Sequence, residues 1–99
     1  MLRHIVSWKL AASDLAVRLE QSGTITASLE ALVPIIPEII SLSVSTNAAK
    51  VEGNWDLVLV GDFADEHALQ AYIDHPEHQR VVGEIRGFFA QRSAIDILV

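Results

Sequence analysis

The stretch W-D-L-V-L-V-G-D-F-A-D-E-H-A-L-Q-A-Y-I-D-H-P-E-H, residues 55–78, predicts a strand followed by a broken helix. Side chains alternate between two sides over residues 55–63, with Trp55, Leu57, Leu59 and Phe63 on one side and Asp56, Val58, Val60 and Asp62 on the other. Such alternation, with β-branched and aromatic members, is typical of a strand. Asp65 then suits the N-cap of a helix, and Pro76 ends that helix and can begin another.

The same reasoning, extended outward, completes one domain over residues 1–99. Residues 2–10 predict the first strand, residues 39–45 the second and residues 93–99 the last. A polar loop, 46–54, joins the second strand to the strand over residues 55–63. A helix is expected to begin at Ser13 or Asp14 and to be ended by Pro34 and Pro37, with a kink near Gly23 where helix propensity is low. The order βαββαβ predicts an α+β, ferredoxin-like fold, in which both helical layers cover one side of a four-stranded antiparallel sheet.

The opposite, open side of the sheet is expected to be an interface. We expect the helices to cover the apolar sides of the strands, including Ile40, Ile95 and Ile97. The open face would then carry an apolar centre inside a rim of serine, lysine and aspartate, the rim including Asp56, Asp62 and Asp96. That centre consists of Ile5, Val58 and Val60, with Ile39 and Leu98 further out on the same interface. An apolar centre with a polar rim is typical of a protein interface and predicts a homodimer, although an antiparallel sheet can also face water.

Composition excludes several classes of partner. Thirteen acidic against seven basic residues give a net charge of −6, which argues against binding to nucleic acid or to anionic membranes. There is no cysteine, no stretch of about 18 apolar residues and no targeting signal, so we expect a small cytoplasmic protein. No phosphate-binding glycine motif is present, and no cofactor is expected.

Two histidines and the single tyrosine occupy positions predicted to face the core. His4 shares its strand side with Val6, His78 precedes Val82 by one helical turn, and Tyr72 lies just before the helix break. A buried neutral imidazole needs hydrogen-bond partners, so Tyr72 and His78 could simply satisfy each other across the break. Alternatively they face a pocket, as a general base and a proton donor.

We expect four further side chains to contact a ligand in such a pocket, namely Trp8, His75, Phe88 and Phe89. His75 and His78 also form an H-x-x-H pair, but Pro76 interrupts the helix between them and no further ligand stands at a suitable spacing. We therefore expect no metal site.

The segments M-L-R-H-I-V-S-W-K-L, N-W-D-L-V-L-V-G-D-F and A-L-Q-A-Y-I-D-H-P-E-H resemble the stress-responsive A/B barrel domain (Dabb) family over essentially the whole chain. The resemblance implies a ferredoxin-like fold that dimerises sheet to sheet into an α+β barrel. Most members have no established activity, but a plant branch of olivetolic acid cyclase-like proteins performs an aldol-type cyclisation. In that branch the tyrosine and second histidine of Y-x-x-H-P-x-H are catalytic and the N-terminal strand histidine lines the site. The matching residues are Tyr72, His78 and His4.

Three functional hypotheses follow. The first is a homodimeric module that binds a small hydrophobic or carbonyl-containing ligand between sheet and helices. The second is a cofactor-free lyase or cyclase, with His78 as the base and Tyr72 orienting a carbonyl oxygen. The third, a cofactor-independent monooxygenase, rests on analogy between folds alone.

Overall fold

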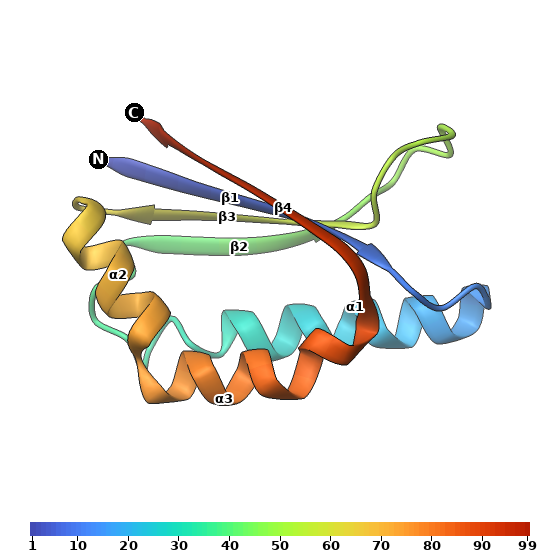
Figure 1. Ribbon diagram of the computed structural model, residues 1–99, viewed down its shortest axis with the longest axis horizontal. Coiled ribbons are helices and arrows are strands. Elements are labelled where there is room, and N and C mark those ends of the chain that lie inside the picture. The colour runs from blue at the N-terminus through green and yellow to red at the C-terminus, as the bar shows by residue number, and fades with distance from the viewer.

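The computed structural model describes residues 1–99 as one sheet covered on one side by helices. The elements are β1 (Leu2–Leu10), α1 (Leu15–Glu30), β2 (Ser41–Thr46), β3 (Leu57–Phe63), α2 (Glu66–Asp74), α3 (Pro76–Ile85), the 3-10 turn η1 (Arg86–Phe88) and β4 (Phe89–Leu98). The strands are antiparallel in the order β2-β3-β1-β4, with the helices on one face (Figure 1). The predicted ferredoxin-like arrangement is confirmed. No helix is long and apolar enough to cross a membrane.

The hydrophobic core lies between this face and the helices. Val6, Leu59 and Phe63 from the two central strands pack there with Ile25 and Leu29 of α1, and all five are at most 2% exposed. Burial of side chains of this size contributes roughly 1.5–3 kcal/mol each, which orders the helices on the sheet.

Helix α1 is continuous, so the expected kink near Gly23 is absent. The Thr24 hydroxyl donates to the carbonyl of Glu20 at 3.2 Å, and Ile25 and Leu29 are anchored in the core. Packing of one apolar side therefore outweighs the low helix propensity of this segment. The helix also ends earlier than expected, at Glu30, whose carboxylate accepts a hydrogen bond from the Val44 amide of β2.

Strand β4 faces the opposite way from the prediction. Its register with β1 pairs Leu98 with Leu2 and Asp96 with His4, which places Leu98 and Asp96 on the helix side. Ile95 and Ile97 lie instead on the open face, opposite Ile5 and Arg3. The prediction of Leu98 on the open face and Asp96 in its rim was wrong, because paired residues of neighbouring strands share a side of the sheet.

The residues before β2 also depart from the expected alternation. Ile39 belongs to the core and is 8% exposed, whereas Ile40 is 55% exposed. Regular pairing begins only at Ser41, so the period of two does not extend back to these residues. The prediction of Ile39 on the open face was wrong, whereas Ile5, Val58 and Val60 do lie on it.

Strand β4 begins earlier than expected, through a bulge. Leu10 pairs with Phe89 and Lys9 with Gln91, so one extra residue, Ala90, is accommodated in β4. Phe89 and Arg92 consequently both face the helix side, although a regular strand would place residues three apart on opposite sides.

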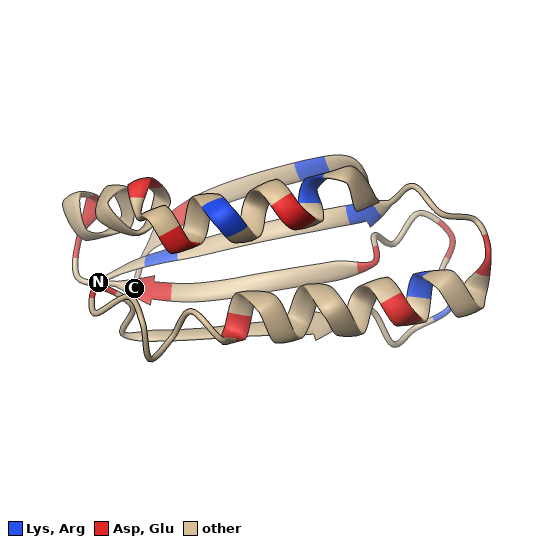
Figure 2. Ribbon diagram, turned by 90° about the horizontal axis from the view of Figure 1, so that it is seen from below, with Lys and Arg blue, Asp and Glu red and all other residues tan.

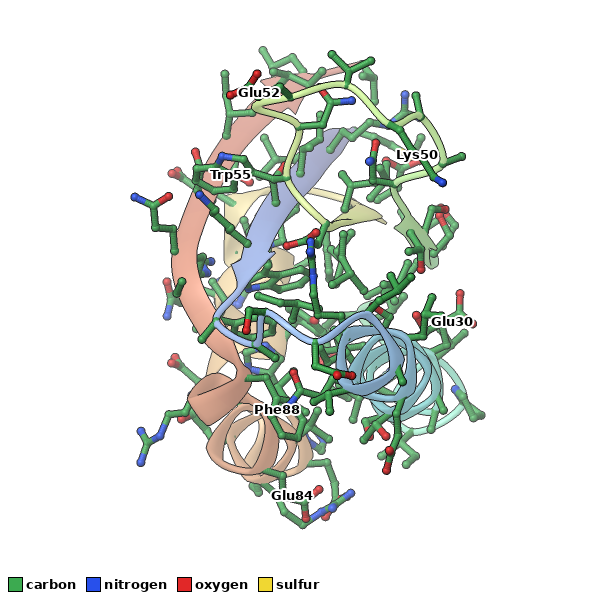
Figure 3. The ribbon with its side chains drawn as sticks, turned by 90° about the vertical axis from the view of Figure 1, so that its right-hand side faces the viewer. Glu30, Lys50, Glu52, Trp55, Glu84 and Phe88 are labelled. Carbon is green, nitrogen blue, oxygen red and sulfur yellow. The ribbon has the colours of Figure 1, made fainter.

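Residues 47–56, which join β2 to β3, form an arm that rises from the sheet on the side away from the helices (Figure 1). Gly53, with φ of 92°, makes its tight turn, and Lys50 and Glu52 lie toward its outer end (Figure 3). Trp55 lies on the arm beside Ser7 and Val58 of the open face, not with Leu57 on the helix side as predicted. Asp56 is likewise not in the open-face rim, because its carboxylate bonds Arg18 of α1.

Candidate functional site

One cavity holds His4, Tyr72 and His78, the three titratable residues that the sequence predicts to face the core. It encloses about 290 Å³ between the sheet and the paired helices α2 and α3. Its apolar wall includes Val6, Trp8, Leu29, Leu59, Val82 and Phe89. Its polar groups are His4, Tyr72, His78, Gln79, Arg86 and Arg92. A larger hollow of about 490 Å³ lies under the arm, but no titratable side chain lines it.

The break between α2 and α3 positions His78. Pro76 has no N–H, so the α2 hydrogen-bond pattern stops, and the amide of Glu77 donates instead to Nδ1 of His75 at 3.1 Å. The carbonyl of Ile73, which that amide would have satisfied, accepts from the His78 ring at 3.0 Å and from the Gln79 side chain at 2.6 Å. The proline therefore supplies the backbone acceptor that fixes the His78 ring.

This hydrogen bond also decides which nitrogen of His78 can act as a base. With Nδ1 donating to the Ile73 carbonyl, the neutral ring carries its lone pair on Nε2, which has no partner in the protein. Burial lowers the pKa of His78 below its ordinary value, despite the opposing effect of the Ile73 hydrogen bond. His78 is therefore neutral at pH 7 and able to accept a proton.

Tyr72 stands beside this imidazole as a donor. The two ring centroids are 4.4 Å apart, and Tyr72 is only 1% exposed. Burial raises its pKa to about 12, an effect that the nearby Arg92 charge reduces. The phenol stays protonated at any physiological pH, and neither His78 nor any other group of the chain forms a hydrogen bond with it. The proposed mutual bond between Tyr72 and His78 is absent.

His4 is held in the same manner by a different acceptor. Its Nδ1 lies 2.6 Å from Oδ1 of Asp96, the residue paired with it on β4, and the His4 side chain is 8% exposed. The carboxylate fixes the ring orientation and directs the lone pair of a neutral His4 to Nε2, as a histidine–carboxylate pair does in many enzymes. The cavity thus contains two imidazoles whose Nδ1 atoms are occupied and whose Nε2 atoms are free.

The aromatic residues expected to contact a ligand divide into two groups. Trp8 and Phe89 form one wall of the cavity, stacked with centroids 5.1 Å apart and planes 12° from parallel. Phe88 packs at the junction of α3 and β4, outside the cavity lining (Figure 3). His75 caps α3 and does not line the cavity either. The aromatic wall leaves the space before His78 and Tyr72 open.

Sequence reasoning missed Asp96 because it assigned that side of the last strand to the open face, and it missed Arg92 because it began the strand only at Ser93. One signal was available. A core-facing His4 needs an acceptor, and Asp96 is the only acidic residue of the last strand.

Comparison with known proteins places this geometry in context. A search of the curated proteins finds no match. Two solved structures described as dimeric ferredoxin-like proteins of unknown function align closely. The one from Bacteroides fragilis has a TM-score of 0.90 and 23% identity, covering 99% of this chain and 95% of its own. The one from Thermobifida fusca has a TM-score of 0.83 and 26% identity, covering 99% and 90%.

A hydroxynitrile lyase from Passiflora edulis shares the same fold. It aligns with a TM-score of 0.80 and 15% identity, covering 99% of this chain and 92% of its own. At that identity the likeness concerns the fold alone. The model of the Stress responsive A/B Barrel Domain family matches residues 2–99, and the chain belongs to that family.

Proposed function

We propose that this chain binds a small, largely apolar molecule with a carbonyl group in the cavity between sheet and helices. The single observation that carries the proposal is that Tyr72 and His78 lie side by side in an open cavity with Oη and Nε2 free of protein partners. Both atoms are accessible from the cavity, so two free polar groups that converge on an apolar pocket support a ligand that bonds both. The stacked Trp8 and Phe89 offer a flat wall to its apolar part.

A second candidate, a cofactor-free lyase or cyclase, is favoured by the protonation states of this pair. His78 is a neutral base and Tyr72 a protonated donor at the same pH. In such a reaction Nε2 of His78 takes a proton from the carbon next to the carbonyl, or from a hydroxyl. The Tyr72 phenol donates a hydrogen bond to the carbonyl oxygen on which negative charge develops. His4, oriented by Asp96, offers a second site for the proton.

The test follows proton exchange at the carbon next to the carbonyl in a panel of diketones and aryl ketones dissolved in D₂O. NMR reports both binding, as line broadening, and exchange. We expect the wild type both to bind a compound and to catalyse this exchange. Tyr72→Phe should weaken binding, and His78→Ala should abolish exchange. His67→Ala, at an exposed position of α2, is the matched control and should behave as the wild type. If no compound binds, the proposal fails; if binding occurs without exchange, the chain is a binding protein and the catalytic candidate fails.

We further propose that the chain is a homodimer through the open face. Ile5, Val58 and Val60 lie at its centre, and β4 adds Ile95 and Ile97, which are 61% and 38% exposed. An exposed apolar patch of this kind marks an interaction site, and the rim contains the Arg3–Asp62 ion pair at 2.8 Å. The dimeric descriptions of the similar Bacteroides and Thermobifida proteins support the proposal.

Sedimentation velocity tests this assembly. We expect the mass of two chains for the wild type and of one chain for Ile95→Lys, because the lysine would place a charge in the apolar centre. Leu15→Lys is the matched control, since Leu15 is 68% exposed on α1 and far from the open face. A wild type that sediments as one chain at micromolar concentration would contradict the proposal.

A further inference from the structure

The chain's five arginines fall into two groups. Arg3, Arg18 and Arg80 each form ion pairs with carboxylates. Arg86 and Arg92 form neither an ion pair nor a side-chain hydrogen bond, and both line the cavity. In a chain with thirteen acidic and seven basic residues, an arginine on the surface would readily find an acidic neighbour. The two arginines without an acidic partner are the two that line the cavity.

The charge of the cavity is opposite to that of the protein. No aspartate or glutamate is among the residues that line it, and Asp96, which contacts the cavity residue His4, is bonded to that histidine. Arg92 stands on β4 opposite Trp8, and Arg86 follows the last turn of α3. Figure 2 shows Lys and Arg segments gathered where α3 leads into β4, while Asp and Glu are spread over the rest of the ribbon.

Arg92 is close enough to act on the proposed reacting groups. Burial is the main cause of the shifted pKa values of Tyr72 and His78, and the charge of Arg92 acts on both groups, opposing the rise in the pKa of Tyr72 and adding to the fall in the pKa of His78. A ligand group that contacts Arg92 would therefore belong to the same molecule that reaches the phenol and the imidazole. Guanidinium groups recognise carboxylates through paired N–H donors, a geometry that suits two arginines at the mouth of an apolar cavity.

We propose that the ligand is an oxo acid, with its carboxylate held by Arg92 and Arg86, its apolar chain against Trp8 and Phe89, and its carbonyl beside Tyr72. This inference rests on the proposed carbonyl-binding function and adds the charge of the ligand. The carboxylate at the mouth anchors the molecule in one orientation, so that its keto group enters toward His78.

The experiment compares a γ-oxo fatty acid with its primary amide, which has nearly the same shape and no charge. Isothermal titration calorimetry at low salt measures both dissociation constants. Because both arginines are exposed, we expect the acid to bind about tenfold more tightly than the amide, and the preference to shrink as salt is added. Arg92→Gln should reduce the preference, and the double variant Arg86→Gln/Arg92→Gln should abolish it.

Arg80→Gln is the matched control. It removes the same charge from α3, but Arg80 pairs with Glu77 and Glu84 and does not line the cavity. It should keep the full preference for the acid. Equal binding of acid and amide, or a preference that survives in the double variant, would overturn the oxo-acid inference and leave the carbonyl-binding function standing. If neither compound binds, both proposals fail.

Discussion

We expect the replacement of Tyr72 by phenylalanine to change the stability of the fold mainly at the high pH values at which the phenol would ionise. The hydroxyl has no hydrogen-bond partner in the protein, so at pH 7 its removal should change the free energy of unfolding by less than about 1 kcal/mol. At high pH the two proteins should diverge. The buried phenol has a pKa of about 12, against 10.0 for a free tyrosine.

The sign and size of this divergence follow from the pKa values of the folded and unfolded states. Above pH 10 the phenol of the unfolded chain loses its proton, while the buried phenol keeps it until about pH 12. The unfolded state is thereby favoured, and the wild type loses about 1.4 kcal/mol of stability per pH unit relative to Tyr72→Phe. Over the two units the loss approaches about 3 kcal/mol.

Two measurements check this prediction. Tyr72 is the only tyrosine, so the tyrosinate absorbance of the folded protein reports this residue alone. Urea unfolding of both proteins, at about pH 9 and about pH 11, gives the difference in stability, in which the lysine and arginine contributions cancel. A phenol that titrates near its ordinary pKa, or equal loss of stability in both proteins, would refute the reasoning that burial isolates Tyr72 from water.

Three further perturbations test the groups around this tyrosine. The lowered pKa of His78 predicts that stability is lost as pH falls below about 6.5, and His78→Gln should lack this loss in urea unfolding. Asp96→Ala removes the hydrogen-bond acceptor of the buried His4 and should lower the free energy of unfolding, measured in denaturant, by about 1–2 kcal/mol. The lower value is expected because Asp96 is half exposed, and Asp96→Asn should recover most of the loss. Asp65 caps α2 by accepting a hydrogen bond from the Ala68 amide at 2.8 Å. Asp65→Ala should therefore lower the free energy of unfolding by about 1 kcal/mol, seen as a lower melting temperature. An unchanged melting temperature would show that the cap does not stabilise the fold.

Most of the fold could be predicted because local patterns determine it. Alternation identified β1 and β3, and the proline at 76 located the break between α2 and α3. Alternation shows which residues share a side of a strand, but not which side faces the core. In β4 the isoleucines at 95 and 97 are more apolar than Ala94 and Asp96, so a hydrophobic criterion points them inward. The register with β1 points them outward.

The candidate site was predictable to the same extent. His4, Tyr72 and His78 were identifiable because a polar residue at a core-facing position is unusual. Asp96 and Arg92 were not, since their place in the site depends on the side of β4 that they occupy. The sequence also gives no local sign that Pro76 would free the Ile73 carbonyl for His78, because that bond depends on the angle between two helices.

The extra residue at the start of β4 decides where in this strand the chain can lose length. Removing Ala90 would close the bulge and leave Gln91–Leu98 paired with β1 as they are. Removing a residue of the regular part, such as Ser93, would exchange the sides of the residues beyond it, so that Asp96 would point away from the cavity and Ile95 and Ile97 into it. One deletion would thus remove the acceptor of His4 and the isoleucines of the open face together. Insertions in the arm, which no regular strand pairing crosses, carry no such penalty. An engineer who wished to graft a new loop onto this protein should use the arm and leave residues 91–98 of β4 at their present length.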